Sequence, residues 1–271
     1  MSQAFLTLVC AALAGLAVLA VVRLLRGRDD DLGSMYDLHP GARFAHRWGF
    51  TDTRFEFDGP RTVRVTGKRY PLCGYRMPHF VDFAEEVLGV PFGPEHMATE
   101  IGDKEVSPSR AGQPLLAALG QRLRANQVSL ADPDRLVHSH GQLSVDEIYR
   151  LLYRGPLPRC VDLVLYPESE EDVRAIVQLA AQHDLCLVPY GGGTNVSAAL
   201  ACPVDEPRAI ASVDMRRLSH IRWLDAENLS ACVEAGVSGM DLERELASRG
   251  YTSGHDPDSV ELSTLGGWIS T

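Results

Sequence analysis

The feature that most constrains the fold is a strand–helix–strand pattern that ends in three consecutive glycines. "CVDLVLYP", from Cys160, is an apolar run of strand length, and "LCLVPY" is a second such run just before "GGGTNV". Between them "EEDVRAIVQLAAQHD" predicts a helix with Ser169 as its N-cap. The apolar stripe predicted for this helix consists of Val173, Ile176, Val177 and Ala180. The pattern predicts an α+β domain that begins β-α-β.

The glycine loop at Gly191–Gly193 predicts either an anion site or a tight turn. Glycine adopts positive φ readily and lets another group approach the backbone closely. Consecutive main-chain N–H groups in such a loop form an anion-binding nest, to which Thr194, Asn195 and Ser197 add polar side chains. No lysine follows as a P-loop requires, and the third glycine of a dinucleotide fingerprint is missing. From these residues alone both interpretations stay open.

A second polar segment, "GYTSGHDPDSVELSTLGGWIST", closes the chain. A run so rich in Gly, Ser, Thr and Asp is typical of surface loops and binding loops. Its apolar members, Val260, Leu262, Leu265 and Trp268, predict packing against another element. For Trp268 we expect plain core packing.

Composition excludes some function classes. The chain has 271 residues and a formal net charge of −10, which argues against nucleic acid as a partner. None of its six cysteines forms a CxxC pair, so we expect reduced, buried thiols, Cys186 and Cys232 among them. His138 and His140 are the closest histidine pair, and no cysteine or carboxylate lies at ligand spacing, so no metal site is predicted.

The N-terminus predicts a membrane anchor over residues 1–25. Ala4 to Val22 carry no charge, and as a helix they would span about 28 Å, the thickness of a hydrocarbon core. Arg23 follows at once and no basic residue precedes the run, so the C-terminal side is expected in the cytosol. A cleaved signal peptide and a helix buried against the body of the protein are the alternatives.

The rest of the chain divides into a linker at 26–42, a partly helical region at 43–157 and the α+β domain at 158–271. In the middle region "HFVDFAEEVLGV" predicts a helix with Phe80, Phe83, Val87 and Leu88 on one face. "PLLAALGQRL" and "SVDEIYRLLYRG" predict two more helices, the latter with a capping box of Ser144 and Glu147, and residues 91–114 predict an exposed loop.

In the α+β domain, "AIASVDM", "HIRWLD" and "LSACVEAGV" are further strand candidates. "SGMDLERELASRG" predicts a short helix that ends at Gly250, a usual residue just beyond a helix C-terminus.

Several motifs carry a family resemblance. "VPYGGGTNVSAAL" with the preceding helix resembles the start of the FAD-binding domain of the vanillyl-alcohol-oxidase type, the PCMH fold. "VEAGVSGMDLE", "GHDPDS", "ELSTLGGWIST", "RWGFTDTRFEF" and "TGKRYPLCGY" resemble the alkyldihydroxyacetonephosphate synthase (alkylglycerone-phosphate synthase) family more closely. The resemblance runs from about Arg47 to Thr271 and leaves out the apolar N-terminus.

The resemblance implies an FAD enzyme of ether-lipid synthesis, which exchanges the acyl chain of acyl-dihydroxyacetone phosphate for a long-chain fatty alcohol without net redox change. It implies that Pro189–Asn195 cradle the FAD pyrophosphate through backbone N–H groups and that Asp258–Thr264 form a second wall. The implied cofactor residues are Pro189, Tyr190, Gly191, Gly192, Gly193, Thr194, Asn195, Asp258, Ser259, Val260, Glu261, Leu262, Ser263 and Thr264. His255 is open between a place beside the ligand and a hydrogen bond within its loop.

The resemblance places the catalytic residues beyond Thr271, so none is assigned here, and this chain alone is expected to bind FAD weakly and to be inactive. Two alternatives remain: an FAD-linked 2-hydroxy-acid oxidase on the same fold, and a membrane-tethered, non-catalytic binding protein. The family favours peroxisomes, although "RLLRGRDDDL" lacks the histidine of the usual peroxisomal signal, and the endoplasmic reticulum membrane is the alternative. A homodimer is a further expectation.

Overall fold

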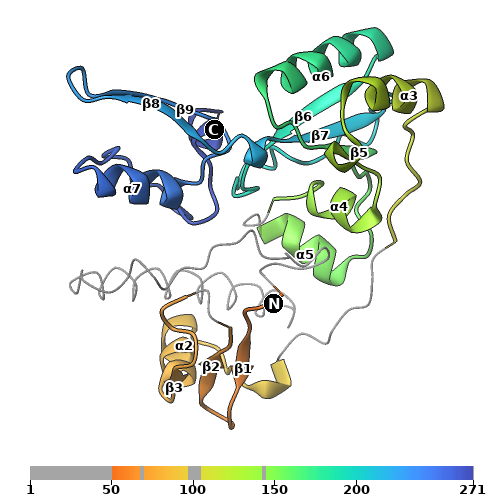
Figure 1. Ribbon diagram of the computed structural model, residues 1–271. Helices are drawn as coiled ribbons and strands as arrows, with labels where there is room; N and C mark the ends of the chain where they lie inside the picture. The colour runs from red at the N-terminus through yellow and green to blue at the C-terminus, as the bar shows by residue number, and fades with distance from the viewer. Residues whose placement is uncertain (1–50, 68–69, 97–104, 142–144, 271) are drawn as a thin grey trace. The chain divides into compact units, whose positions relative to one another are not determined.

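The computed structural model describes residues 51–67, 70–96, 105–141 and 145–270 (Figure 1). The predicted membrane anchor and the linker at 26–42 lie outside these residues. Within the part of the chain that is described, no helix is both long enough and apolar enough to span a bilayer.

The chain forms two compact units. The first comprises Met1–Asp103 with Tyr149–Arg154, and the second comprises Lys104–Ile148 with Gly155–Thr271. This division lies elsewhere than the domain boundaries predicted before residues 43 and 158, because the segment before the first predicted strand of the α+β domain groups with that domain.

The first unit contains a small antiparallel sheet of order β1-β2-β3. Its elements are β1 (Phe55–Phe57), β2 (Val63–Val65), β3 (Arg76–Met77), α2 (Phe80–Leu88) and the 3-10 turn η2 (Pro94–His96).

Helix α2 is confirmed, but its predicted buried face is wrong. Val81 and Ala84 are buried, whereas Phe83 and Val87 are exposed. Apolar residues occupy two neighbouring faces of this helix, so their periodicity fits either face and does not decide which one packs inward.

The second unit is built on a mixed sheet of order β4-β5-β7-β6, in which β5, β7 and β6 run parallel and β4 runs antiparallel to β5. The strands are β4 (Val128–Ser129), β5 (Leu163–Leu165), β6 (Cys186–Tyr190) and β7 (Ile210–Asp214). The helical elements of this unit are α3 (Gln113–Arg122), η3 (Ala125–Gln127), α4 (Asp132–Val137) and α6 (Glu170–His183), and α5 (Val145–Tyr153) is divided between the two units. The predicted β-α-β start is therefore confirmed as β5-α6-β6.

Helices α3 and α6 share one core with the central strands (Figure 1). The residues of this core are Leu115, Leu119, Leu123, Leu163, Leu165, Ile176, Leu179, Ala180, Leu185, Ala211 and Val213. A smaller buried cluster consists of Val161, Val164, Ile210 and Cys202, of which Val164 and Ile210 are alternate residues of β5 and β7. Strands β5 and β7 are thus buried on both faces, as parallel strands usually are.

Helix α6 begins where the sequence predicts. Ser169 is its N-cap, and its Oγ accepts a 3.1 Å hydrogen bond from the Asp172 N–H. The predicted stripe is only partly right, because Ile176 and Ala180 are buried but Val177 is 54% exposed. The stripe is centred on Ala175 and Leu179 instead, and Val177 lies about 100° away from Ile176 around the helix axis.

The last part of the second unit is a hairpin, β8 (Ile221–Asp225) and β9 (Ser230–Val233), packed with α7 (Gly239–Ser248) and α8 (Leu265–Ser270). The 3-10 turn η4 (Met215–Arg217) connects it to β7. All the predicted strands are present. Gly250, at φ +80°, lies just beyond the α7 C-cap as predicted.

The five described cysteines are free thiols, with Cys160 and Cys202 buried. The prediction that Cys232 is buried is wrong, because it lies on the outer face of the β8–β9 hairpin. Within the described ranges, no cluster of His, Cys, Asp and Glu could hold a metal ion.

Candidate functional site

The glycine loop leaves the sheet at the carboxyl end of its parallel strands. Tyr190, the last residue of β6, pairs with Asp214, the last residue of β7. Open α/β sheets bind ligands outside this edge, because the loops that follow the strands gather there. The local fold therefore presents Gly191–Asn195 where a ligand can reach it.

The structure brings the two predicted cofactor segments together. A methyl group at Gly191 would overlap Thr264 Oγ1, and one at Gly192 would overlap the Leu262 carbonyl oxygen. Glycine at 192 lets the main chains of the two segments touch, and glycine at 191 leaves room for the Thr264 side chain. The space freed by these two missing side chains is thus filled by the protein itself.

Gly193 differs from its two neighbours. It is buried and adopts φ +70°, the left-handed region that favours glycine. Among the described residues, neither the Gly193 N–H nor the Thr194 N–H has a hydrogen-bond acceptor. A buried N–H without a partner is uncommon and destabilising, so this pair of successive donors fits a phosphate oxygen.

The two ends of the loop differ from its centre. Pro189 has no N–H and belongs to strand β6. The Asn195 side chain is already engaged, since its Oδ1 accepts a 2.9 Å hydrogen bond from the Ala199 N–H. The cofactor contacts that the resemblance implies for these two residues stay predictions.

The second segment, Asp258–Thr264, is a tight turn closed on itself. Ser259 is buried at φ +56°, and its carbonyl oxygen accepts hydrogen bonds from Leu262 N (2.9 Å) and Ser263 N (2.8 Å). The Val260 carbonyl oxygen accepts a 3.1 Å hydrogen bond from Met240 N. Capping and turn contacts therefore occupy much of its polar main chain.

The hydroxyls of this segment also have partners. Ser263 Oγ accepts a 2.8 Å hydrogen bond from Trp268 Nε1, and Thr264 Oγ1 accepts one of 3.3 Å from Gly267 N. The Trp268 ring packs against the α7 cluster, so the prediction of core packing is confirmed. Thr264 also forms an isolated bridge with Ser238, the N-cap of α7.

The remaining members of the segment lie toward solvent. Asp258 is exposed and Glu261 is half-buried. Burial raises the pKa of the Glu261 carboxyl above its usual range. His255 is exposed, its N–H donates to Ser253 Oγ at 3.2 Å, and its ring lies edge-on to Trp268 at 5.0 Å, a set of contacts within its own loop.

A buried polar cluster beside the loop was not found from the sequence. Asp214 accepts hydrogen bonds from His138 Nε2 at 3.0 Å and from Arg216 Nη2 at 2.5 Å. Burial alone raises the pKa of the Asp214 carboxyl, but the hydrogen bonds from His138 and Arg216 outweigh it and bring that pKa well below its usual range. The aromatic ring of Tyr190 stacks on this cluster, 4.3 Å from the His138 ring and 5.2 Å from the Arg216 guanidinium carbon.

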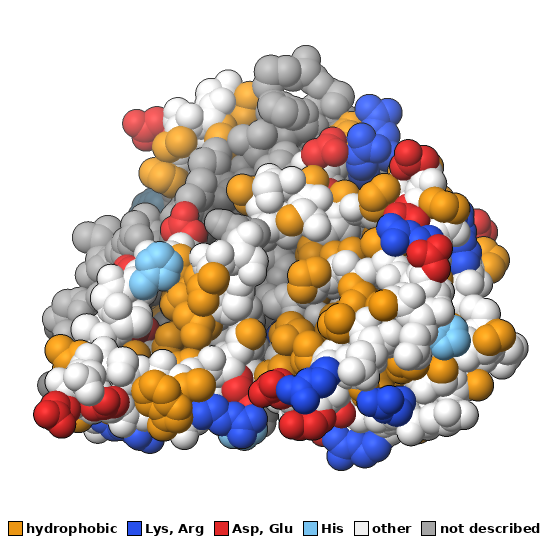
Figure 2. All heavy atoms as spheres, turned by 90° about the horizontal axis from the view of Figure 1, so that it is seen from above, with side chains coloured by type: hydrophobic (Ala, Val, Ile, Leu, Met, Phe, Trp, Pro, Cys, Tyr) orange, Lys and Arg blue, Asp and Glu red, His pale blue; other side chains and the backbone are white. Residues whose placement is uncertain are grey.

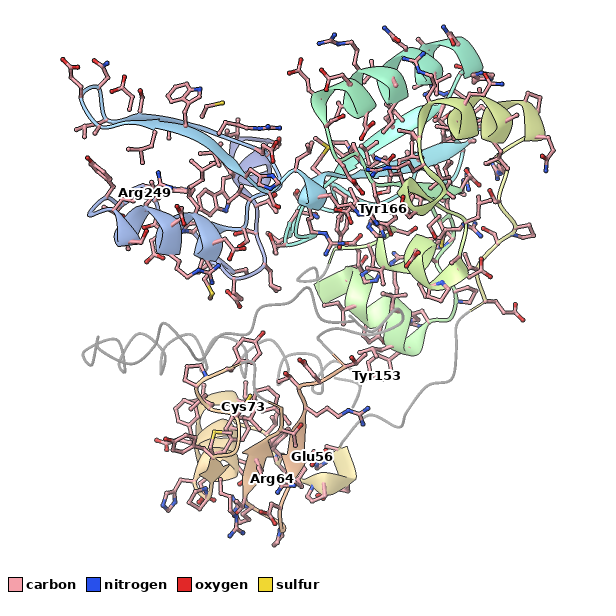
Figure 3. The ribbon with its side chains drawn as sticks, in the orientation of Figure 1. Glu56, Arg64, Cys73, Tyr153, Tyr166 and Arg249 are labelled. Atoms are coloured by element: carbon pink, nitrogen blue, oxygen red, sulfur yellow. The ribbon has the colours of Figure 1, made fainter. Side chains whose placement is uncertain are left out.

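Cationic side chains continue outward from this cluster. Figure 3 labels Tyr166, whose ring centre lies 4.7 Å from the Arg217 guanidinium carbon and 5.9 Å from the His138 ring centre. Glu168 pairs with Arg217 at 2.7 Å and also with Arg124. The signal available in the sequence for this cluster was Asp214, an acidic residue at the end of a parallel strand. Its partner His138 lies too far away in the sequence for the contact to be inferred.

Gly141 also contacts the glycine loop. A methyl group there would lie 3.0 Å from the Asn195 carbonyl oxygen, and the Gly141 N–H donates to Glu147 Oε2 at 3.1 Å. The predicted capping box cannot be assessed, because Ser144 lies outside the described residues. Glu147 Oε1 is buried and has no partner among them.

Figure 2 shows acidic and basic side chains beside one another on the face in view, with hydrophobic side chains gathered between them.

Comparisons with known proteins agree with this geometry. Residues 161–271 match the family model described as an FAD binding domain, so the FAD expectation is confirmed for the domain family. The alkyldihydroxyacetonephosphate synthase of Caenorhabditis elegans is 38% identical over 226 residues, 83% of this chain and 37% of that protein. The enzyme of the same name from Trypanosoma brucei brucei is 34% identical over 230 residues, 82% of this chain and 36% of that protein.

A solved structure of an alkyldihydroxyacetonephosphate synthase superposes with a TM-score of 0.72 at 29% identity, over 89% of this chain and 43% of that one. The chain thus spans less than half the length of the relatives that it matches.

Proposed function

The chain belongs to the alkyldihydroxyacetonephosphate synthase family, and from that premise we propose that its glycine loop holds the pyrophosphate of FAD for the ether-lipid exchange reaction. In that reaction a fatty alcohol replaces the acyl chain of acyl-dihydroxyacetone phosphate without net redox change. The observation that carries the proposal is the pair of successive N–H groups at Gly193 and Thr194, left without acceptors in the described part of the chain.

The residues of this chain fit the cofactor. The two N–H groups would bind a phosphate oxygen, and the packing of Leu262 and Thr264 onto the loop would fix their direction. Arg216 is cationic and lies next to Tyr190, the residue that precedes the glycine loop. Positive charge near a phosphate favours binding of the phosphate. When bound, FAD supplies the chemistry of the exchange, and these residues supply binding and orientation.

We propose further that this chain alone binds FAD weakly and has no turnover. The β8–β9 hairpin supports this, because Trp223 on it is 54% exposed and would suit a further segment that covers this face.

The direct test is flavin content and turnover of two polypeptides: this chain, and this chain joined to the remaining sequence of a relative. We expect the joined protein to absorb near 450 nm and to incorporate labelled fatty alcohol into alkyl-dihydroxyacetone phosphate, and this chain to do neither. Reduced flavin with consumption of an electron acceptor would favour the 2-hydroxy-acid oxidase. A folded joined protein without flavin would favour the non-catalytic binding protein.

We also propose a membrane-associated protein anchored by the apolar run Ala4–Val22, in peroxisomes or, as the alternative, in the endoplasmic reticulum. Lipid substrates made at membranes support a tether. A tagged full chain imaged with markers of both organelles decides between them. Light scattering of the purified protein tests the homodimer.

A further inference from the structure

Four consecutive buried residues, His138 to Gly141, contact the glycine loop at both of its ends. The His138 ring packs on Tyr190, which precedes the loop, and Gly141 lies against the Asn195 carbonyl oxygen. This is the "HSHG" stretch in which the sequence offers two histidines without a metal-ligand pattern. Its contacts give it a different role.

Both ring nitrogens of His138 face acceptors. Nδ1 lies 2.7 Å from the Asp134 carbonyl oxygen, and Nε2 lies 3.0 Å from Asp214 Oδ2. Contacts at both nitrogens hold the imidazole in one orientation. The side chain of His138 is 3% exposed and that of Asp214 is 2% exposed, so this pair is shielded from water.

The His138 ring fixes the position of Tyr190. His138 and Arg216 both bond to Asp214, and the Tyr190 ring centre lies 4.3 Å from the His138 ring centre and 5.2 Å from the Arg216 guanidinium carbon. Tyr190 in turn backs the loop, because a methyl group at Gly193 would lie 2.7 Å from its hydroxyl oxygen and 3.1 Å from its ring. The contacts therefore run without a gap from His138 to the residue whose N–H is unpaired.

We propose that His138 is a positioning residue of the flavin site: hydrogen-bonded to the Asp134 carbonyl oxygen and to the Asp214 carboxylate, it fixes Tyr190 against Gly193 and so aims the Gly193 and Thr194 amides at the cofactor phosphate. The proposal rests on the assignment of the glycine loop to FAD. It adds a residue that touches neither cofactor nor substrate and acts through Tyr190.

The test compares His138→Gln with His220→Gln in the full 271-residue chain. His220 also pairs with a carboxylate, at 2.9 Å from Glu234, but it is on the surface of the hairpin and makes no contact with the loop that the structure records. Binding of FAD, and of ADP as a probe that carries the pyrophosphate without the flavin ring, is measured below the melting temperature of every variant.

We expect His138→Gln to weaken FAD and ADP binding by the same factor, about tenfold, as the loss of a hydrogen bond to a charged group predicts. His220→Gln should stay within about twofold for both, since surface pairs contribute little. A purely structural role would lower the melting temperature of His138→Gln and leave both affinities unchanged, which would overturn the proposal.

A second measurement needs no ligand. In the 15N-labelled chain the Gly193 and Thr194 amide signals should move in His138→Gln and stay in place in His220→Gln, because the loop lies against the Tyr190 ring. If the unmodified chain binds neither FAD nor ADP but this difference between the variants is observed, the assignment to FAD fails for this chain while the positioning role stands. If the Gly193 and Thr194 signals are unchanged in both variants, the positioning role is wrong.

Discussion

The two polar segments that meet at the edge of the sheet use their main chains in opposite ways. In the glycine loop, the N–H groups of Gly193 and Thr194 have no acceptor within the described part of the chain. In the segment 258–264, the N–H groups of Leu262 and Ser263 are both bonded to the Ser259 carbonyl oxygen. The two stretches share a composition of small and polar residues, but the second closes onto its own carbonyl oxygen and the centre of the first makes no such bond.

From this difference we infer that the glycine loop is the binding element and that the segment 258–264 is its support. The segment 258–264 is held by hydrogen bonds within its own turn, and it packs onto Gly191 and Gly192. The loop can then hold unpaired donors in place, at a free-energy cost that a bound anion would offset. Substitutions in the support should therefore change stability, and substitutions at the centre of the loop should change ligand binding as well.

The largest effect is expected at the charged cluster beside the loop. Asp214→Asn leaves His138 and Arg216 buried without their anion, which should lower the free energy of unfolding by about 4 kcal/mol at pH 7. Urea unfolding measures it, with the exposed Asp205→Asn as the control.

The pH dependence of that difference has a definite sign. Because the pKa of the Asp214 carboxyl is lowered in the folded protein, its stabilisation is present above the ordinary carboxyl pKa of about 4 and is lost as the pH falls below it. The gap between the unmodified chain and Asp214→Asn should therefore narrow below about pH 4. A gap that stays constant down to pH 2 would contradict the ion pair.

The contact between the two segments is tested by Gly192→Ala. The added methyl group would overlap the Leu262 carbonyl oxygen, a backbone atom that cannot move aside cheaply, so the free energy of unfolding should fall by about 3 kcal/mol. Gly120→Ala is the matched control, because that glycine lies within α3 with open space around it, and it should stabilise by about 0.5 kcal/mol or more. Equal effects of the two changes would show that the segments do not pack as described.

Gly193→Ala should affect both properties. An alanine at φ +70° is strained by about 1.5 kcal/mol, and its methyl group would also press on Tyr190. Gly254→Ala has nearly the same φ, +69°, in open space, so it should show the strain without the loss of FAD affinity. Isothermal calorimetry with FAD distinguishes the two variants. If both variants lose the same affinity for FAD, the proposed difference between the glycine loop and the segment 258–264 is wrong.

Ser263→Ala should act on the support. It removes the acceptor of Trp268 Nε1 and should lower stability by about 1 kcal/mol, measured by thermal unfolding with intrinsic tryptophan fluorescence. Ser248→Ala is the control, since its hydroxyl bonds to Glu245 O on the exposed face of α7. No difference between the two serines would mean that the Trp268 hydrogen bond does not stabilise the turn.

The smallest effect is expected at Glu261. Burial raises the pKa of this carboxyl, so its charged form is disfavoured in the folded protein. Glu261→Gln should stabilise the chain at pH 7 by about 0.5 kcal/mol, and the gain should vanish below about pH 4, where the carboxyl is protonated in both states. A loss of stability at pH 7 would show that the carboxylate has a partner that favours its charge.

Local signals in the sequence predicted local structure well. Ser169 caps α6 and Gly250 ends α7 because these preferences arise within a single turn of chain. The buried faces of α2 and α6 were partly mispredicted, because exposed apolar residues such as Phe83 and Val177 do not show on which side of the helix the core lies.

The site was predictable only in outline. The glycine loop can be recognised from its composition, and the family resemblance identifies the segment 258–264 as a second part of the site. That Gly191 and Gly192 serve protein packing, and that His138 meets Asp214, depend on contacts between residues far apart in the sequence. Such contacts follow from the strand order β5-β7-β6, and no local sequence pattern predicts that order.

The most direct test of the central claim is an amide NMR titration of the 15N-labelled chain with FAD. Our account predicts that the Gly193 and Thr194 amide proton signals shift downfield with increasing FAD while those of Leu262 and Ser263 move much less, even if the affinity is low. Saturable FAD binding that leaves the Gly193 and Thr194 signals in place would contradict it.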